Sequence, residues 1–124
     1  MGWFDRLFRR PVQPAPAGPT LICSGCYTIC RGSAAHVIPW WNESQNDFVT
    51  TYRCDGCLLQ SLDETEAKVR AWDASTRDKF CEFLQRHRLP DLAGQIHEAP
   101  LPEATRPALA FLNRLRSGEH RLSP

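Results

Sequence analysis

The sequence predicts a small α+β protein in which a cysteine-bearing β-hairpin is followed by two or three helices that shield the sheet. Two observations predict this fold class. Two CxxC pairs flank a stretch with the alternation of strands, and the apolar residues change to a helical period after residue 60. The chain has 124 residues, 42% of them apolar, and ten prolines, which favours a small domain with extended flanks over one compact body.

We expect three regions along the chain. Residues 1–19 should form a short amphipathic helix and a Pro-rich tether, residues 20–60 the cysteine-bearing unit, and residues 61–124 a helical extension that packs on it.

The N-terminal helix is expected over residues 2–10, with its apolar side chains on one face and charged ones opposite. A helix of this length is too short to be stable alone in water. Its apolar face therefore needs a surface to pack on. Three alternatives are its own domain, the groove of a protein partner, and a membrane surface that it contacts peripherally. The apolar residues are Trp3, Phe4, Leu7 and Phe8.

Two strands are predicted in the segments HVIPWW and DFVTTYRC, joined by the turn-like NESQN. Trp40 and Trp41 are neighbours, so one could enter the core while the other is exposed near Tyr52 to anchor a peptide or stack a base. Alternatively, both tryptophans cover the flanks of a unit too small to bury its own sheet. Trp40, Trp41 and Tyr52 are thus candidate partner-binding residues.

Three helical segments are expected after the hairpin. The first starts at Ser61 with a polar cap and early acids. The second restarts at Ser75 and ends before Pro90, and a third covers Pro107 to Arg116. The segments HRLPD and IHEAPLPE have the composition of loops.

The two CxxC pairs predict a metal site. Zinc prefers four tetrahedral ligands and binds thiolates well, and a CxxC pair in a tight turn directs two sulfurs to one point. We therefore assign Cys23, Cys26, Cys54 and Cys57 as ligands of a structural Zn²⁺. A glycine precedes the second cysteine of each pair, where a left-handed backbone is often required.

These two CxGC knuckles, with β-structure between and around them, resemble the zinc-ribbon group over about residues 20–60. The resemblance implies a structural metal and a binding surface, but members of the group differ widely in function. Cys30 or His36 could replace one of the four ligands, and a rubredoxin-like iron site is an alternative. We favour Cys30 as a small buried apolar residue, and we interpret Cys81 as a core residue.

Catalysis at this site is not expected. Four thiolates complete the zinc coordination shell, whereas a catalytic zinc keeps an open position. The knuckles also lack the His-x-Glu of zinc deaminases and the βαβ context of a redox CxxC. We therefore expect that the protein is not an enzyme.

The charge balance bears on partners and location. The net charge is only +1, and residues 20–60 carry two arginines against three acids, which disfavours a nucleic-acid-binding ribbon of the transcription or translation type without excluding it. The N-terminus lacks the apolar run of a secretory signal, and no stretch is long enough to span a membrane, so we expect a cytoplasmic protein. The favoured function is a non-catalytic interaction module, an adaptor or assembly subunit that binds a protein partner.

Overall fold

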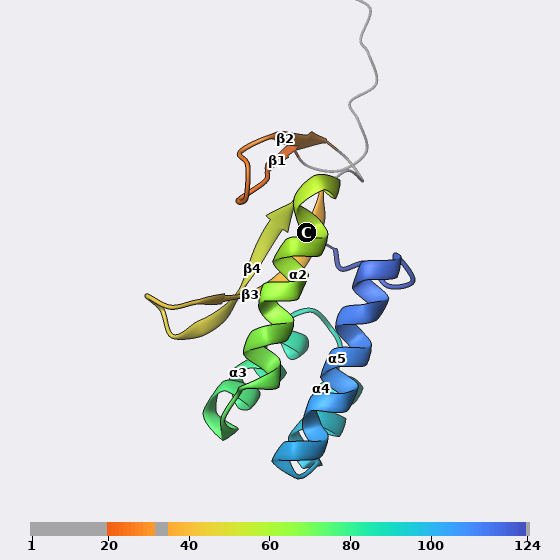
Figure 1. Ribbon diagram of the computed structural model, residues 1–124. Coiled ribbons are helices and arrows are strands. Elements are labelled where there is room, and N and C mark those ends of the chain that lie inside the picture. Colours follow the sequence, from red (N-terminus) through yellow and green to blue (C-terminus); the bar gives the residue numbers. More distant parts are fainter. Residues whose placement is uncertain (1–19, 32–34, 124) are drawn as a thin grey trace, which may run out of the picture.

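The structure, a computed structural model, describes residues 20–31 and 35–123 (Figure 1). Within these ranges it contains two antiparallel hairpins and four helices, which confirms the predicted α+β class. The strands are β1 (Thr20–Ile22), β2 (Ile29–Arg31), β3 (His36–Asn42) and β4 (Asp47–Arg53). The helices are α2 (Asp55–Arg70), α3 (Ala74–Arg86), α4 (Pro90–Glu98) and α5 (Leu101–Ser117).

The predicted hairpin of β3 and β4 is confirmed. Its register pairs Trp41 with Phe48 and closes with Asn42 opposite Asp47. The side-chain oxygen of Asn42 accepts hydrogen bonds from the Ser44 hydroxyl at 2.7 Å and from the Gln45 N–H at 3.1 Å, which holds the turn. The second hairpin, β1 with β2, is short and pairs Ile22 with Ile29.

Helix α2 begins at Asp55, directly after β4, and not at Ser61 as predicted. Cys54 takes the extended N-cap conformation and Asp55 supplies an acidic side chain to the first turn, where the helix dipole favours a negative charge. The predicted boundary between residues 60 and 61 therefore lies inside a helix. Helix α3 follows with Asp73 as its cap, whose carboxylate accepts from the Thr76 N–H at 2.8 Å.

In the described part of the chain four helices follow the hairpin of β3 and β4, one more than the largest number predicted there. The two segments interpreted as loops overlap both ends of α4. This helix starts at Pro90, a residue well suited to the first helical position because it needs no N–H partner there. Helix α5 begins at Leu101 and continues through Pro107. Its apolar face is buried, and this burial outweighs the hydrogen bond that the internal proline removes.

The hairpin of β3 and β4 and the four helices share one core. Phe80 lies at its centre and makes edge-to-face contacts with Phe48 and Trp72, at ring-centroid distances of 5.2 and 5.6 Å. A separate small cluster of Cys23, Cys30 and Ala35 lies under the first hairpin. Figure 1 shows that β1 and β2 lie at the end of the molecule next to the start of α2, away from the helical body. No helix in the described residues is long and apolar enough to cross a membrane.

Candidate metal centre

The four cysteines of the two CxxC pairs come together at the junction of the first hairpin and α2. The sulfur atoms of Cys23, Cys26, Cys54 and Cys57 all lie within 4.8 Å of one another. The Cys26 and Cys54 sulfurs, one from each pair, are 3.6 Å apart. All six cysteines are free thiols. The structure thus brings the predicted ligand set into one cluster at metal-binding distances.

The first pair lies in the turn that joins β1 to β2. The Cys23 N–H donates to the Thr28 carbonyl at 2.9 Å, and the Tyr27 N–H donates to the Cys23 carbonyl at 2.8 Å. The Gly25 N–H points at the Cys23 sulfur, 3.4 Å away. This turn is fixed to the body by a hydrogen bond of 2.9 Å from the Ser24 N–H to the Tyr52 carbonyl on β4.

The second pair lies at the N-terminus of a helix, where a second tight turn was predicted. Cys54 is the N-cap of α2 and Cys57 is in the first turn. The Cys57 and Leu58 N–H groups both donate to the Cys54 carbonyl at 3.1 Å. The second pair is therefore held at the positive end of the α2 dipole.

The left-handed backbone predicted at Gly25 and Gly56 is absent; among the described residues of the first knuckle, Tyr27 takes this conformation, with φ of 63°. Gly25 is required for a different reason. A Cβ at this position would lie 3.1 Å from the Cys57 sulfur and 3.2 Å from the Cys57 Cβ. At Gly56 the nearest such atom, the Cys54 sulfur, is 3.9 Å away. The close approach of the two cysteine pairs therefore excludes a side chain at position 25 but not at position 56.

The cysteines of the cluster differ in pKa because each accepts a different set of hydrogen bonds from the backbone and from neighbouring side chains. Burial raises the pKa of Cys23, but hydrogen bonds from the backbone of Cys54, Cys26 and Gly25 outweigh it and lower this pKa to about 6. The hydroxyl and backbone of Thr28 lower the pKa of Cys26. Hydrogen bonds with the Cys26, Cys23 and Cys54 side chains raise the pKa of Cys57 to about 12. The cluster thus carries negative charge and keeps a proton at neutral pH.

The donor set fits a tetrahedral zinc ion. Zn–S bonds of about 2.3 Å place neighbouring sulfurs about 3.8 Å apart, close to the 3.6 Å between Cys26 and Cys54. A zinc ion with four thiolates carries a net charge of about −2, and soft thiolates also suit iron. The cluster can therefore hold a metal ion, and Cys23, Cys26, Cys54 and Cys57 would be its ligands.

Two alternative ligands lie outside the cluster. Cys30 is buried in the small apolar cluster under the hairpin, and this burial raises the pKa of its thiol. The imidazole Nε2 of His36 pairs with the Asp55 carboxylate at the start of α2, and this contact lowers the pKa of Asp55. Cys81 is buried in the main core, as predicted, and burial raises its pKa to about 11.

Arg53, missed by the sequence interpretation, is a buried cation directly beside the cluster. Arg53 is only 5% exposed. Its Nε donates to the Ser61 hydroxyl at 2.7 Å and one Nη to the Thr51 hydroxyl at 2.6 Å. In the described part of the chain no carboxylate lies within 4 Å of this guanidinium. A buried charge is unfavourable unless it is compensated, and the adjacent thiolates carry charge of the opposite sign.

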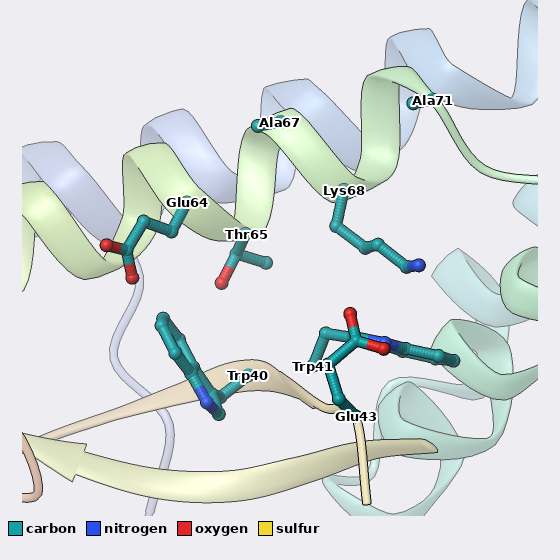
Figure 2. A pocket seen from close by; sticks show the side chains of 8 residues that line it. All are labelled: Trp40, Trp41, Glu43, Glu64, Thr65, Ala67, Lys68 and Ala71. Carbon is teal, nitrogen blue, oxygen red and sulfur yellow. The ribbon is translucent and has the colours of Figure 1, made fainter. Parts of the chain in front are cut away.

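The candidate partner-binding residues on the strands are separated by the fold. Trp40 and Trp41 are both half-buried and line a pocket of about 440 Å³ between the hairpin and α2. Figure 2 shows Thr65 and Lys68 of α2 facing them. The Arg53 guanidinium carbon lies 4.9 Å from the Trp40 ring centroid, and the Lys68 Nζ 4.3 Å from that of Trp41.

Tyr52 lines a different pocket, next to the turn after α3. Neither tryptophan is exposed: both are half-buried beside α2, and Trp41 also packs against the main core. This fits the interpretation in which both tryptophans cover the flank of the sheet better than the one that leaves one of them exposed. Trp3, Phe4, Leu7 and Phe8 lie outside the described residues, and their role stays a prediction.

Exposed apolar side chains gather on the segments that carry the cysteines. Among the described residues the large ones are Ile22 (57% exposed), Tyr27 (78%), Ile29 (58%) and Leu59 (56%). Leu21 and Cys30 face inward from β1 and β2, so alternation directs the paired Ile22 and Ile29 outward. The alternation within TLI and ICR could have indicated this, but strands of three residues give a weak signal.

Comparison of the chain with models of protein families, with curated protein sequences and with solved structures finds no match.

Proposed function

We propose that this protein is a non-catalytic interaction module, an adaptor or assembly subunit, in which a structural Zn²⁺ bound by Cys23, Cys26, Cys54 and Cys57 presents an apolar surface to a protein partner. The observation that carries the proposal is the position of the cysteine cluster. It joins the first hairpin to the start of α2, and this hairpin carries the most exposed apolar side chains of the described chain.

The donor set supports the proposal that the metal centre is not catalytic. Four thiolates leave no open position for a water or a substrate on a tetrahedral zinc ion. The metal then contributes folding energy to the part of the chain that it joins. This argument supports a structural role and assigns no reaction to the protein.

A protein partner suits the surface better than a nucleic acid. Ile22 and Ile29 form an exposed apolar pair, and Tyr27 in the turn between β1 and β2 is exposed as well. Exposed apolar patches mark interaction sites. Phosphate binding needs an excess of positive charge, whereas residues 20–60 carry two arginines and three acids. A cytoplasmic location remains a prediction.

The test compares the natural chain with an Ile22→Ser/Ile29→Ser variant in affinity purification from source cells, with mass spectrometry of the recovered proteins. Both side chains are more than half exposed, so the variant keeps its metal and its circular dichroism spectrum. We expect a specific partner to be lost with this variant and retained with Ala110→Ser, a matched exposed position on α5. A partner that both variants retain would contradict the proposed surface, and a gel shift of nucleic acid at low salt without a protein partner would favour the alternative.

A further inference from the structure

A second pocket, of about 730 Å³, is lined by none of the cysteines, and its role does not rest on the proposed metal function. It is bounded by Thr50 and Tyr52 of β4, by the turn that follows α3, and by residues 120–123. Its volume falls within the range of sites for small molecules, about 300–1,000 Å³.

The charges of this pocket have one sign. Arg86, Arg88 and Arg121 line it together with two histidines, and no aspartate or glutamate does. The whole chain has a net charge of only +1, so this concentration of cations is local. In the part of the chain that the structure describes, no carboxylate lies within 4 Å of the Arg86 or Arg88 guanidinium. These two guanidinium groups therefore have no counter-ion among the described residues.

The walls of the pocket are held in place by contacts to the body. One Nη of Arg86 donates to the Phe48 carbonyl at 2.8 Å, and the Thr50 hydroxyl and the His87 Nε2 are hydrogen-bonded at 2.7 Å. On the opposite wall, Leu122 is buried in the main core, and Arg121 donates to the Ala35 carbonyl at 2.9 Å. A preorganised site of this kind loses little entropy when it binds a ligand.

Arg88 takes an unfavourable backbone conformation at this site. Its φ is 61°, in the left-handed region that favours glycine. The Leu89 N–H donates to the Leu84 carbonyl and the Arg88 N–H to the Gln85 carbonyl, at 2.9 and 3.1 Å. This is the Schellman arrangement at a helix end, in which glycine is the usual residue at the position of Arg88. Strained residues cluster at functional sites, and here the strain places a long cation beside the pocket.

We propose that this pocket binds a small organic phosphate of nucleotide size. Guanidinium groups match the oxygens of a phosphate with paired, charge-assisted hydrogen bonds, and Tyr52 supplies an aromatic wall for a base. A nucleic-acid polymer would need an extended basic surface, whereas the three arginines here line one recess.

The test uses the full zinc-loaded chain and isothermal titration calorimetry with ADP, adenosine, inorganic phosphate and a short single-stranded oligonucleotide. We expect ADP to bind more tightly than adenosine or inorganic phosphate. Arg88→Gly should weaken ADP binding about tenfold or more through the lost charged hydrogen bond. The same substitution should leave the melting temperature equal or higher, because glycine relieves the backbone strain. Arg106→Gln, an exposed position on α5 outside the pocket, removes the same charge and should bind ADP normally.

Several results would overturn this proposal. The pocket is not a nucleotide site if ADP does not bind at millimolar concentration, or if Arg88→Gly binds it as well as the natural chain. If inorganic phosphate binds as tightly as ADP, the pocket is a site for free anions and not for nucleotides. An oligonucleotide that binds more tightly than ADP, with a steep dependence on salt, would show a nucleic-acid surface instead. None of these outcomes depends on the apolar patch of the first hairpin.

Discussion

Gly25 and Cys57 lie so close across the two cysteine pairs that a Cβ at position 25 would be 3.1 Å from the Cys57 sulfur. We therefore expect Gly25→Ala to displace Cys57 or the first knuckle by a few tenths of an ångström. Overpacking of this kind disfavours the closed cluster by about 1–3 kcal/mol. The zinc affinity, measured by competition with a chromogenic chelator, should fall about fivefold to a hundredfold.

Gly56→Ala is the matched control, because Gly56 precedes the second cysteine of its own pair just as Gly25 does. The nearest atom to a Cβ at position 56 is 3.9 Å away, an ordinary contact. Within the first turn of α2 an alanine favours the helix, by up to about 1 kcal/mol. Equal losses of zinc affinity in the two variants would contradict the steric role of Gly25.

Removal of the metal should release the first hairpin and leave the helical body folded. None of the four clustered cysteines belongs to the main core, which is built from the second hairpin and the helices. After treatment with a chelator, hydrogen exchange should become fast at the Cys23 and Tyr27 amides and stay slow in α3 and α5. The helical circular dichroism signal should persist. A loss of this signal in parallel with the zinc would show that the metal holds the whole chain together.

The affinity for zinc should rise with pH. The pKa of Cys57 is raised to about 12, so this thiol keeps its proton at neutral pH until the metal displaces it. Each displaced proton makes the affinity about tenfold higher per pH unit. The pKa of Cys23 is lowered to about 6, so below about pH 6 a further proton competes and the slope steepens. Competition titrations from pH 5 to 8 measure this, and an affinity independent of pH would contradict the shared-proton account.

Arg53→Met should destabilise the fold by about 2–3 kcal/mol, because it leaves the buried Thr51 and Ser61 hydroxyls without their partner. Arg70→Met is the control. Arg70 pairs with Glu66 at 3.0 Å on the surface, with 60% of its side chain exposed, and such pairs contribute less than about 1 kcal/mol. Urea unfolding of the zinc-loaded chains measures both changes, and similar losses would argue against a special role for Arg53.

The sequence predicted the parts of the fold that depend on local spacing and alternation. The two CxxC spacings were sufficient to select Cys23, Cys26, Cys54 and Cys57 without the structure, and alternation located both strands of the second hairpin. The start of α2 was missed because the turn that holds Cys54 and Cys57 is also the first turn of a helix. A CxxC spacing alone does not distinguish these two local structures.

Proline explains the errors in the C-terminal half. Pro90 was interpreted as a helix end, but it is the first residue of α4. Pro107 was interpreted as a helix start, but it lies inside α5. The helix continues through Pro107 because Ala104, Ala108 and Phe111 are buried in the main core. Such tertiary packing cannot be predicted from local composition. The basic pocket was missed for the same reason, since β4, the end of α3 and the C-terminal segment meet only in the folded chain.

The metal itself is the central claim, and native mass spectrometry of the purified chain, compared with an acid-denatured sample, tests it most directly. We expect one zinc ion per chain, lost on denaturation and lost in a Cys54→Ser variant but retained in Cys81→Ser, whose thiol lies in the main core. An excess mass that matches iron would assign the four thiolates to an electron-transfer site. A metal-free chain lighter by two hydrogens per cysteine pair would contradict the account, because the cluster would then consist of disulfides.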